Sequence, residues 1–148
     1  MDPHPLIVAP GDGHKLSNPV GGQVTFKVRG SQSDGEVTAF ESVIAPGDGP
    51  PLHTHANEVE ILYVLDGSFR FQLGDDVVEA PMGATMFVPR GTPHCFQNAG
   101  AHPGTLLIVF APSGMERFFE LTGADRSAFA EMAAKVGMEV VGPPVGTR

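Results

Sequence analysis

The stretch HTHANEVE, residues 53–60, contains two histidines and two glutamates within eight positions. His53 and His55 are two residues apart, so on an extended strand both rings project from the same face. We expect Glu60 to return on the next strand, and His94, in the later stretch GTPHCFQN, to come from a distant strand. Imidazole nitrogens combined with a carboxylate oxygen suit a divalent transition metal. The pattern therefore predicts one metal site, formed by His53, His55, Glu60 and His94, in a pocket inside a barrel.

Glycine and proline residues flank both stretches at defined spacings. The first pattern reads G-x5-H-x-H-x4-E-x6-G from Gly47 to Gly67, and the second reads G-x5-P-x-G-x2-H-x3-N from Gly83 to Asn98. At all ten of these fixed positions the chain resembles the two signature motifs of the cupin superfamily. The C-terminal part also resembles that of small single-domain bacterial cupins related to quercetin dioxygenases.

This resemblance implies an all-β fold, a cupin jelly-roll β-barrel (double-stranded β-helix) with a short C-terminal helical segment. Residues 1–148 are expected to form one cupin domain, with the barrel core at about 20–112 and the helices at about 114–137. By the same resemblance Glu60 is the catalytic residue, both a metal ligand and a base acting on a substrate hydroxyl. The cofactor is one divalent ion of Fe, Mn, Ni, Co, Cu or Zn, and the residues do not determine which.

Glu58 is the alternative carboxylate ligand. It shares its face with Glu60 on the expected strand, so it replaces Glu60 if the loop before the strand shifts the register. Its spacing fits the first motif less well than that of Glu60. We therefore favour a solvated position for Glu58, or a contact behind one of the ligands.

Composition limits the class of protein. The net charge is -8 and the 9 Lys and Arg residues are scattered, which argues against a nucleic-acid partner. One cysteine excludes an intramolecular disulfide. The N-terminal segment lacks the features of a signal peptide, and no apolar run approaches the ~18 residues of a membrane span. We expect a cytoplasmic protein with no membrane association.

Short β-like segments alternate with turns over most of the chain. Val59–Leu65 is apolar on both faces except at Glu60, so a second layer should cover its outer face, and we expect a homodimer. The predicted strands are 23–29, 36–45, 59–65, 69–73, 77–80, 85–89, 94–98 and 105–111.

After Pro112 the apolar residues recur at the spacing of a helix, which predicts two short helices. Asp125 or Ser127 is the predicted cap of the second helix. We favour simple packing of the apolar stripe over the barrel. The alternative is that Met115, Phe118 or Phe119 covers the mouth of the pocket. The apolar positions at helical spacing are Met115, Phe118, Phe119, Phe129, Met132, Ala133 and Val136.

Apolar residues are predicted to line the pocket, which favours a small apolar organic substrate over a sugar. Cys95 follows His94 on its strand, points to the opposite face and is interpreted as a small buried hydrophobic residue. The predicted lining residues are Leu62, Val64, Met82, Met86, Phe87, Phe96 and Phe110.

The predicted function is that of a metal-dependent dioxygenase acting on a small enol, phenol or diketone, with dioxygen as co-substrate. Two alternatives stay open: a metal-dependent isomerase, decarboxylase or cyclase, and a non-catalytic module that binds a metal or a small molecule. The fold alone does not separate them.

Overall fold

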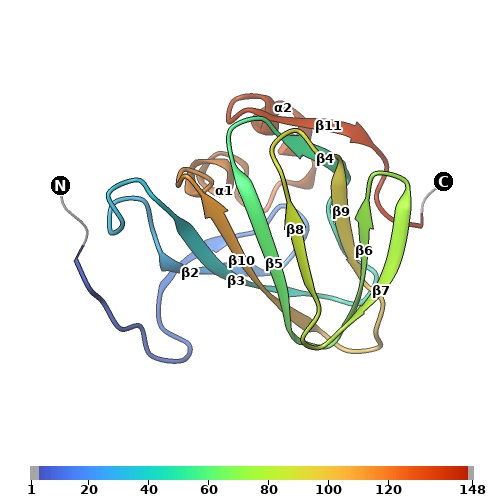
Figure 1. The fold of residues 1–148 in the computed structure, drawn as a ribbon, viewed down its shortest axis with the longest axis horizontal. Helices are drawn as coiled ribbons and strands as arrows, with labels where there is room; N and C mark the ends of the chain where they lie inside the picture. The colour runs from blue at the N-terminus through green and yellow to red at the C-terminus, as the bar shows by residue number, and fades with distance from the viewer. Residues whose placement is uncertain (1–3, 147–148) are drawn as a thin grey trace.

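The computed structural model describes residues 4–146, which form two antiparallel sheets packed face to face (Figure 1). The six-stranded sheet has the order β1-β2-β3-β10-β5-β8, and the five-stranded sheet has the order β11-β4-β9-β6-β7. The strands are β1 (His14–Ser17), β2 (Gln23–Val28), β3 (Thr38–Ile44), β4 (Leu52–His55), β5 (Val59–Asp66), β6 (Ser68–Leu73), β7 (Asp76–Pro81), β8 (Thr85–Val88), β9 (His94–Asn98), β10 (Gly104–Ala111) and β11 (Met138–Gly142).

This architecture confirms the predicted jelly-roll barrel. All eight predicted strands are present, with ends that differ by one or two residues. The histidine pair lies on β4, as an extended strand requires. The strands β1 and β11 were not predicted, because both are short and lack a clear alternation of apolar and polar residues.

The interior is formed by alternate residues of the long strands. On β10, Leu106, Ile108 and Phe110 are at most 4% exposed, while the residues between them are half-buried. The register of the sheet places Phe110 beside Glu60 of β5, and Ile108 beside Leu62. Glu60, Leu62 and Val64 of β5 therefore point into the same apolar interior as the side chains of β10.

The C-terminal segment contains fewer helical residues than predicted. It consists of α1 (Glu116–Thr122), a 3-10 turn η1 (Arg126–Ala128) and α2 (Phe129–Ala134), followed by β11. Gly123 ends α1 with φ 52°. The side chain of Asp125 accepts a hydrogen bond from the backbone N–H of Ser127, so Asp125 caps the turn η1 that leads into α2, whereas α2 itself begins after Ala128 without a side-chain cap. Val136 lies beyond the end of α2, so its place in the helical stripe was predicted wrongly.

Figure 1 shows α1, α2 and β11 gathered at one end of the barrel. The strand β11 pairs with β4, with Met138 opposite His55 and Val140 opposite His53. The chain's last strand is therefore bonded directly to the strand that carries two predicted metal ligands.

The outer face of β5 is open to solvent in the single chain. Ile61, Tyr63 and Leu65 are each 38–41% exposed, and Phe87 of β8 lies opposite Ile61 and is 55% exposed. Phe87 therefore belongs to the outer face, and Met82 is 67% exposed, so the prediction that these two line the pocket was wrong. Within residues 4–146 there is no helix of the length and apolarity needed to cross a membrane.

Candidate metal centre

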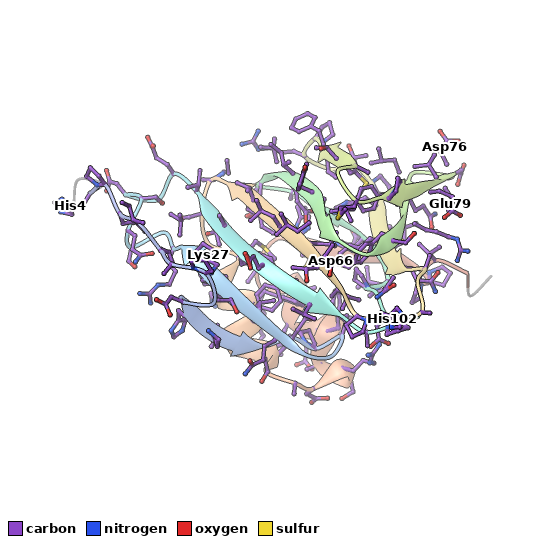
Figure 2. The ribbon with its side chains drawn as sticks, turned by 90° about the horizontal axis from the view of Figure 1, so that it is seen from below. His4, Lys27, Asp66, Asp76, Glu79 and His102 are labelled. Atoms are coloured by element: carbon purple, nitrogen blue, oxygen red, sulfur yellow. The ribbon has the colours of Figure 1, made fainter. Side chains whose placement is uncertain are left out.

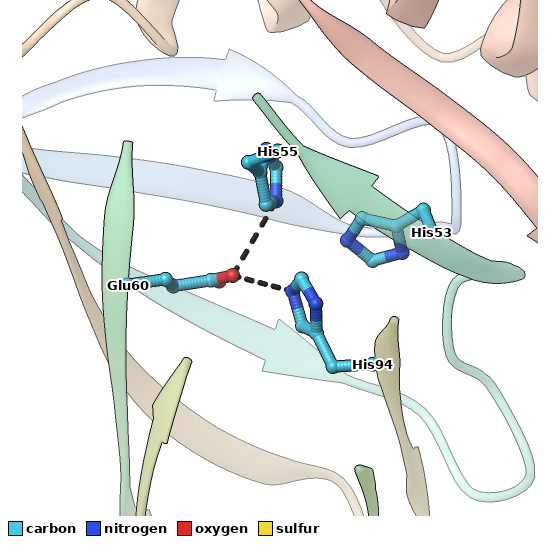
Figure 3. A group of neighbouring side chains, drawn as sticks. All are labelled: His53, His55, Glu60 and His94. Carbon is cyan, nitrogen blue, oxygen red and sulfur yellow. Dashed lines mark hydrogen bonds and ion pairs between the residues drawn. The ribbon is translucent and has the colours of Figure 1, made fainter. Parts of the chain in front are cut away.

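Four side chains from three strands meet at one point inside the barrel (Figure 3). His53 and His55 come from β4, Glu60 comes from β5 and His94 comes from β9, where it lies directly opposite His53. All four are 1–4% exposed, and one ligand atom from each lies within 4.8 Å of the others. The structure thus brings together all four residues that the sequence predicted as ligands.

The contacts within the cluster centre on one carboxylate oxygen. Oε1 of Glu60 lies 2.6 Å from Nε2 of His94 and 3.4 Å from Nε2 of His55. Two ligands at right angles, each ~2.1 Å from a shared metal, are separated by roughly 3 Å. The observed separations therefore match a ligand set that needs only small side-chain movements to close around one ion.

Hydrogen bonds to the backbone orient two of the three imidazole rings. Nδ1 of His53 lies 2.7 Å from the carbonyl oxygen of Pro51, and Nδ1 of His94 lies 2.9 Å from that of Thr92. A carbonyl oxygen only accepts, so both Nδ1 atoms carry the hydrogen and donate it. This tautomer leaves Nε2 of each ring free as a metal ligand.

His55 is oriented differently. Neither of its ring nitrogens has a hydrogen-bond partner within the described part of the chain, although both are buried. Nε2 faces Glu60, and Nδ1 lies 3.9 Å from Oε1 of Glu58, which is also buried and without a hydrogen bond. Glu58 therefore lies behind His55, on the side away from Glu60.

The position of Glu58 decides among the roles that the sequence allowed for it: metal ligand, solvated side chain or contact behind a ligand. Glu58 is 6% exposed, so the solvated position is wrong, and it is not a member of the four-residue cluster. Its oxygen faces the outer nitrogen of a ligand, the position that orients ligating histidines in many metal sites. Burial raises the pKa of Glu58, against the opposing effect of the His55 ring.

The electrostatics of the cluster favour one ion pair and one neutral ring. Burial alone raises the pKa of Glu60, but the charge of His94 and the nearby His55 hold that pKa well below its ordinary value. Burial lowers the pKa of His94, but the charge and hydrogen bond of Glu60 outweigh it, and the net shift is upward. Burial, together with the two other histidines, lowers the pKa of His53 to about 3. Without a metal, the proton of the cluster therefore resides on His94.

The donor set fits a single divalent metal ion. Three imidazole nitrogens and one carboxylate oxygen are buried together, and Nε2 of His55, which has no hydrogen-bond partner among the described residues, faces this cluster. Nε2 of each histidine and a carboxylate oxygen of Glu60 would hold such an ion, and His94 would bind it without its Nε2 proton. The donors do not select one metal, since several first-row divalent ions accept this set.

The site opens into a small apolar chamber of about 50 Å³. His53, His55 and Glu60 form part of its wall, and Phe96 and Phe110 line it as predicted. Predicted lining residues Leu62, Val64 and Met86 are buried in the core but do not reach it.

The C-terminal segment forms the roof of this chamber. Met115, Phe118 and Phe119 of the α1 region line it together with Phe129 of α2 and Met138 of β11. The ring centre of Phe129 lies 6.2 Å from that of His53. The segment therefore packs its apolar side chains over the barrel, as predicted, and the same side chains also line the chamber. Phe129 and Met138 were not assigned to the pocket from sequence, because contact with it depends on how β11 pairs with β4.

The other cysteine, asparagine and histidine residues considered in the sequence have structural roles or lie at the surface. Cys95 is fully buried on the face opposite the ligands, as predicted, and its thiol contacts the side chain of Gln72. Asn98 bonds the backbone of Ile44, His102 and Gly100 through its side chain, which confirms its role in a turn. His4, His14 and His102 are exposed, and Figure 2 shows His4 and His102 at the periphery.

The model of the cupin domain family matches residues 40–110, the segment that carries all four clustered residues. Residues 40–110 therefore form a cupin domain. Its two motif segments correspond to β4–β5 and β8–β9, and the motif glycines Gly47, Gly67, Gly83 and Gly91 all have positive φ, as turns between such strands require.

Several known proteins are similar to this cupin. An uncharacterized protein of Methanocaldococcus jannaschii is 32% identical over 72 residues, which are 49% of this chain and 58% of that protein. A predicted oxalate decarboxylase of Thermotoga maritima superposes with a TM-score of 0.64 at 23% identity, over 72% of this chain and 99% of the other. An RmlC-like cupin of Shewanella frigidimarina gives 0.65 at 17% identity, over 78% and 98%. At these identities the two solved structures show the fold. The M. jannaschii alignment spans little more than half of that protein.

Proposed function

We propose that this cupin is a metal-dependent dioxygenase acting on a small, uncharged enol, phenol or diketone. The observation that carries the proposal is a buried set of three histidines and one glutamate that opens into an apolar chamber. When bound, the metal would supply Lewis-acid and redox chemistry, with two coordination positions left for other ligands if it is six-coordinate. The chain's own residues supply the pocket, the exclusion of water and a base.

The base in this proposal is Glu60. His94 and His55 hold the pKa of Glu60 low in the metal-free cluster, and a bound cation would also favour the ionised carboxylate, so a carboxylate oxygen is available to accept a proton from a substrate hydroxyl. A carboxylate with a low pKa is a weak base, and it matches an acidic hydroxyl better than an aliphatic alcohol. Enols and phenols have such hydroxyls, which supports this substrate class.

The chamber supports an uncharged substrate. No Lys or Arg is among the described residues that line it. A second anionic group on the substrate, away from the metal, would be buried without a counter-charge, and this is costly. This disfavours dicarboxylates and phosphorylated compounds as substrates.

Chamber size favours a small substrate. A cavity that holds benzene has a volume of about 150 Å³, whereas this chamber has about 50 Å³. A flavonol is much larger than benzene, so its entry requires a large displacement of the roof. A short β-diketone or enol requires less.

The test is dioxygen uptake by protein loaded separately with Fe, Mn, Ni, Co, Cu or Zn. The substrates are catechols, short β-diketones and flavonols. We expect the highest uptake with a short β-diketone, loss of uptake in His94→Ala, and at least about a 100-fold lower rate in Glu60→Gln. Full turnover and metal content in Glu60→Gln would contradict its role as base. Metal binding without turnover of any substrate would favour the non-catalytic module, and turnover without dioxygen would favour an isomerase, decarboxylase or cyclase.

We also propose a homodimer formed through the outer face of β5 and β8. Ile61, Tyr63, Leu65 and Phe87 are exposed there side by side, and such uncharged patches are typical of interfaces. Sedimentation should give a dimer that Phe87→Glu dissociates. The control Val78→Glu, at an exposed position of the other sheet, should leave the dimer intact. A monomeric wild-type protein would contradict the proposal.

A further inference from the structure

Two polar side chains interrupt the apolar wall of the chamber away from the metal ligands. Apart from His53, His55 and Glu60, the polar side chains among the described lining residues are those of Asn18 and Ser42. Asn18 is 6% exposed and Ser42 is 1% exposed. Buried polar groups in an apolar pocket commonly determine how a ligand is oriented.

The pair is held in place from two strands. Asn18 follows β1, and its Oδ1 accepts a hydrogen bond of 3.0 Å from the backbone N–H of Val20. Its Nδ2 donates to Oγ of Ser42 at 3.2 Å. Ser42 lies on β3, where it is paired with Leu106 of β10 in the register. The two side chains therefore have little freedom to turn away from the chamber.

Asn18 and Ser42 each keep one hydrogen-bond donor that has no acceptor among the described residues. The amide of Asn18 has two hydrogens, and the bond to Ser42 uses one of them. The hydroxyl of Ser42 accepts this bond, and within residues 4–146 its own hydrogen has no acceptor. The turn at Val20 explains why Asn18 is present, but it does not explain a buried serine hydroxyl beside it. A buried donor without a partner is destabilising, and an acceptor on a bound ligand would remove that penalty.

We propose that Asn18 and Ser42 form a subsite for a neutral oxygen acceptor, such as a carbonyl or ether oxygen, on a molecule whose other end binds the metal. The absence of Lys and Arg among the described lining residues excludes a partner for an anionic group there. This subsite rests on the proposed function, since it requires a metal at the four-residue cluster. It adds that the substrate has oxygen at both ends and an apolar part between them.

The test uses hydroxamic acids, which chelate transition metals, with full-length protein loaded with Zn²⁺. Each probe carries a short alkyl chain with one ether oxygen, placed at successive positions, and is compared with the hydrocarbon in which CH₂ replaces that oxygen. Calorimetry measures Kd for each pair. One neutral hydrogen bond corresponds to about a 2- to 12-fold preference for the ether at the matching position.

Three variants separate the subsite from general effects. Ser42→Ala should weaken the preference for the ether, because Asn18 keeps its amide hydrogens, and the double variant Asn18→Ala/Ser42→Ala should abolish it while leaving the Kd of the hydrocarbon within about 2-fold. Thr122→Val removes another buried hydroxyl without a partner, which is not among the lining residues, and should retain the preference. A melting curve of each variant confirms that it is folded.

The outcomes distinguish the two proposals. Zn²⁺-dependent binding with no preference at any position, or a preference that persists in Asn18→Ala/Ser42→Ala, overturns the subsite alone. Binding that does not depend on Zn²⁺, or no binding by Zn²⁺-loaded protein, overturns both the subsite and the metal-centred function on which it rests.

Discussion

Substitution of Glu58 tests whether this residue orients His55 for metal binding. Nδ1 of His55 and Oε1 of Glu58 are buried, 3.9 Å apart and without hydrogen bonds, so the contact contributes little in the metal-free protein. A metal on Nε2 places the ring hydrogen on Nδ1, and a small movement then forms a charge-assisted hydrogen bond. Such a bond contributes about 1.5–3 kcal/mol, or about 10- to 150-fold in affinity.

We therefore expect Glu58→Leu to weaken Zn²⁺ binding by about 10- to 100-fold. Glu58→Gln keeps an acceptor but loses the charge, and should weaken binding by about 3- to 10-fold. Both variants should leave the unfolding free energy of the metal-free protein unchanged or higher. Both variants remove a buried carboxylate oxygen that has no hydrogen bond. They break no hydrogen bond of His55, because its ring nitrogens have none in the described residues.

The assay is competition for Zn²⁺ with a chromophoric chelator, with chemical denaturation of the metal-free protein measured in parallel. Glu139→Gln is the control, because it removes the same charge from an exposed position on β11. Zn²⁺ affinity of Glu58→Leu within about 2-fold of wild type would refute the orienting role. Loss of affinity in proportion to a loss of metal-free stability would show that Glu58 acts on the fold instead.

Three further predictions concern the fold and the pH dependence. Gly49→Ala should destabilise the protein by at least about 2 kcal/mol in denaturation, because the added Cβ would lie 1.9 Å from the carbonyl oxygen of Phe96; unchanged stability would contradict this contact. Glu116 accepts hydrogen bonds from the hydroxyl of Thr38 and the N–H of Gly30. Burial raises the pKa of Glu116, but these hydrogen bonds outweigh it and the net shift is downward. Glu116→Gln should therefore lower the free energy of unfolding by about 1–2 kcal/mol at pH 7. That difference should be present above the unfolded pKa of about 4.5 and disappear as pH falls through the lower folded pKa, as denaturation at pH 7 and pH 3 would show. The raised pKa of His94 means that the metal displaces one proton, so Zn²⁺ affinity should fall about 10-fold per pH unit below that pKa; affinity independent of pH would place the proton elsewhere.

The metal ligands could be predicted from sequence because strand periodicity and motif spacing both act locally. Two residues on one strand share a face whatever the rest of the chain does, so His53 and His55 were predicted together. The short connection at 56–58 joins β4 to β5 and returns the chain, so Glu60 faces the same interior as the two histidines. The barrel, its eight main strands and the four-residue cluster follow from these local rules together with the motif resemblance.

The chamber, in contrast, was decided by contacts between distant segments. Asn18 and Ser42 meet 24 residues apart, and β11 reaches β4 from more than 80 positions away. Nothing in the local pattern of Phe129 or Met138 distinguishes a residue that faces a metal site from one that faces a core. The sequence by itself therefore determined the donors that a metal needs. Only the tertiary structure decided what surrounds it, because the size, charge and remote donors of the chamber arise where separate strands and the C-terminal roof pack together.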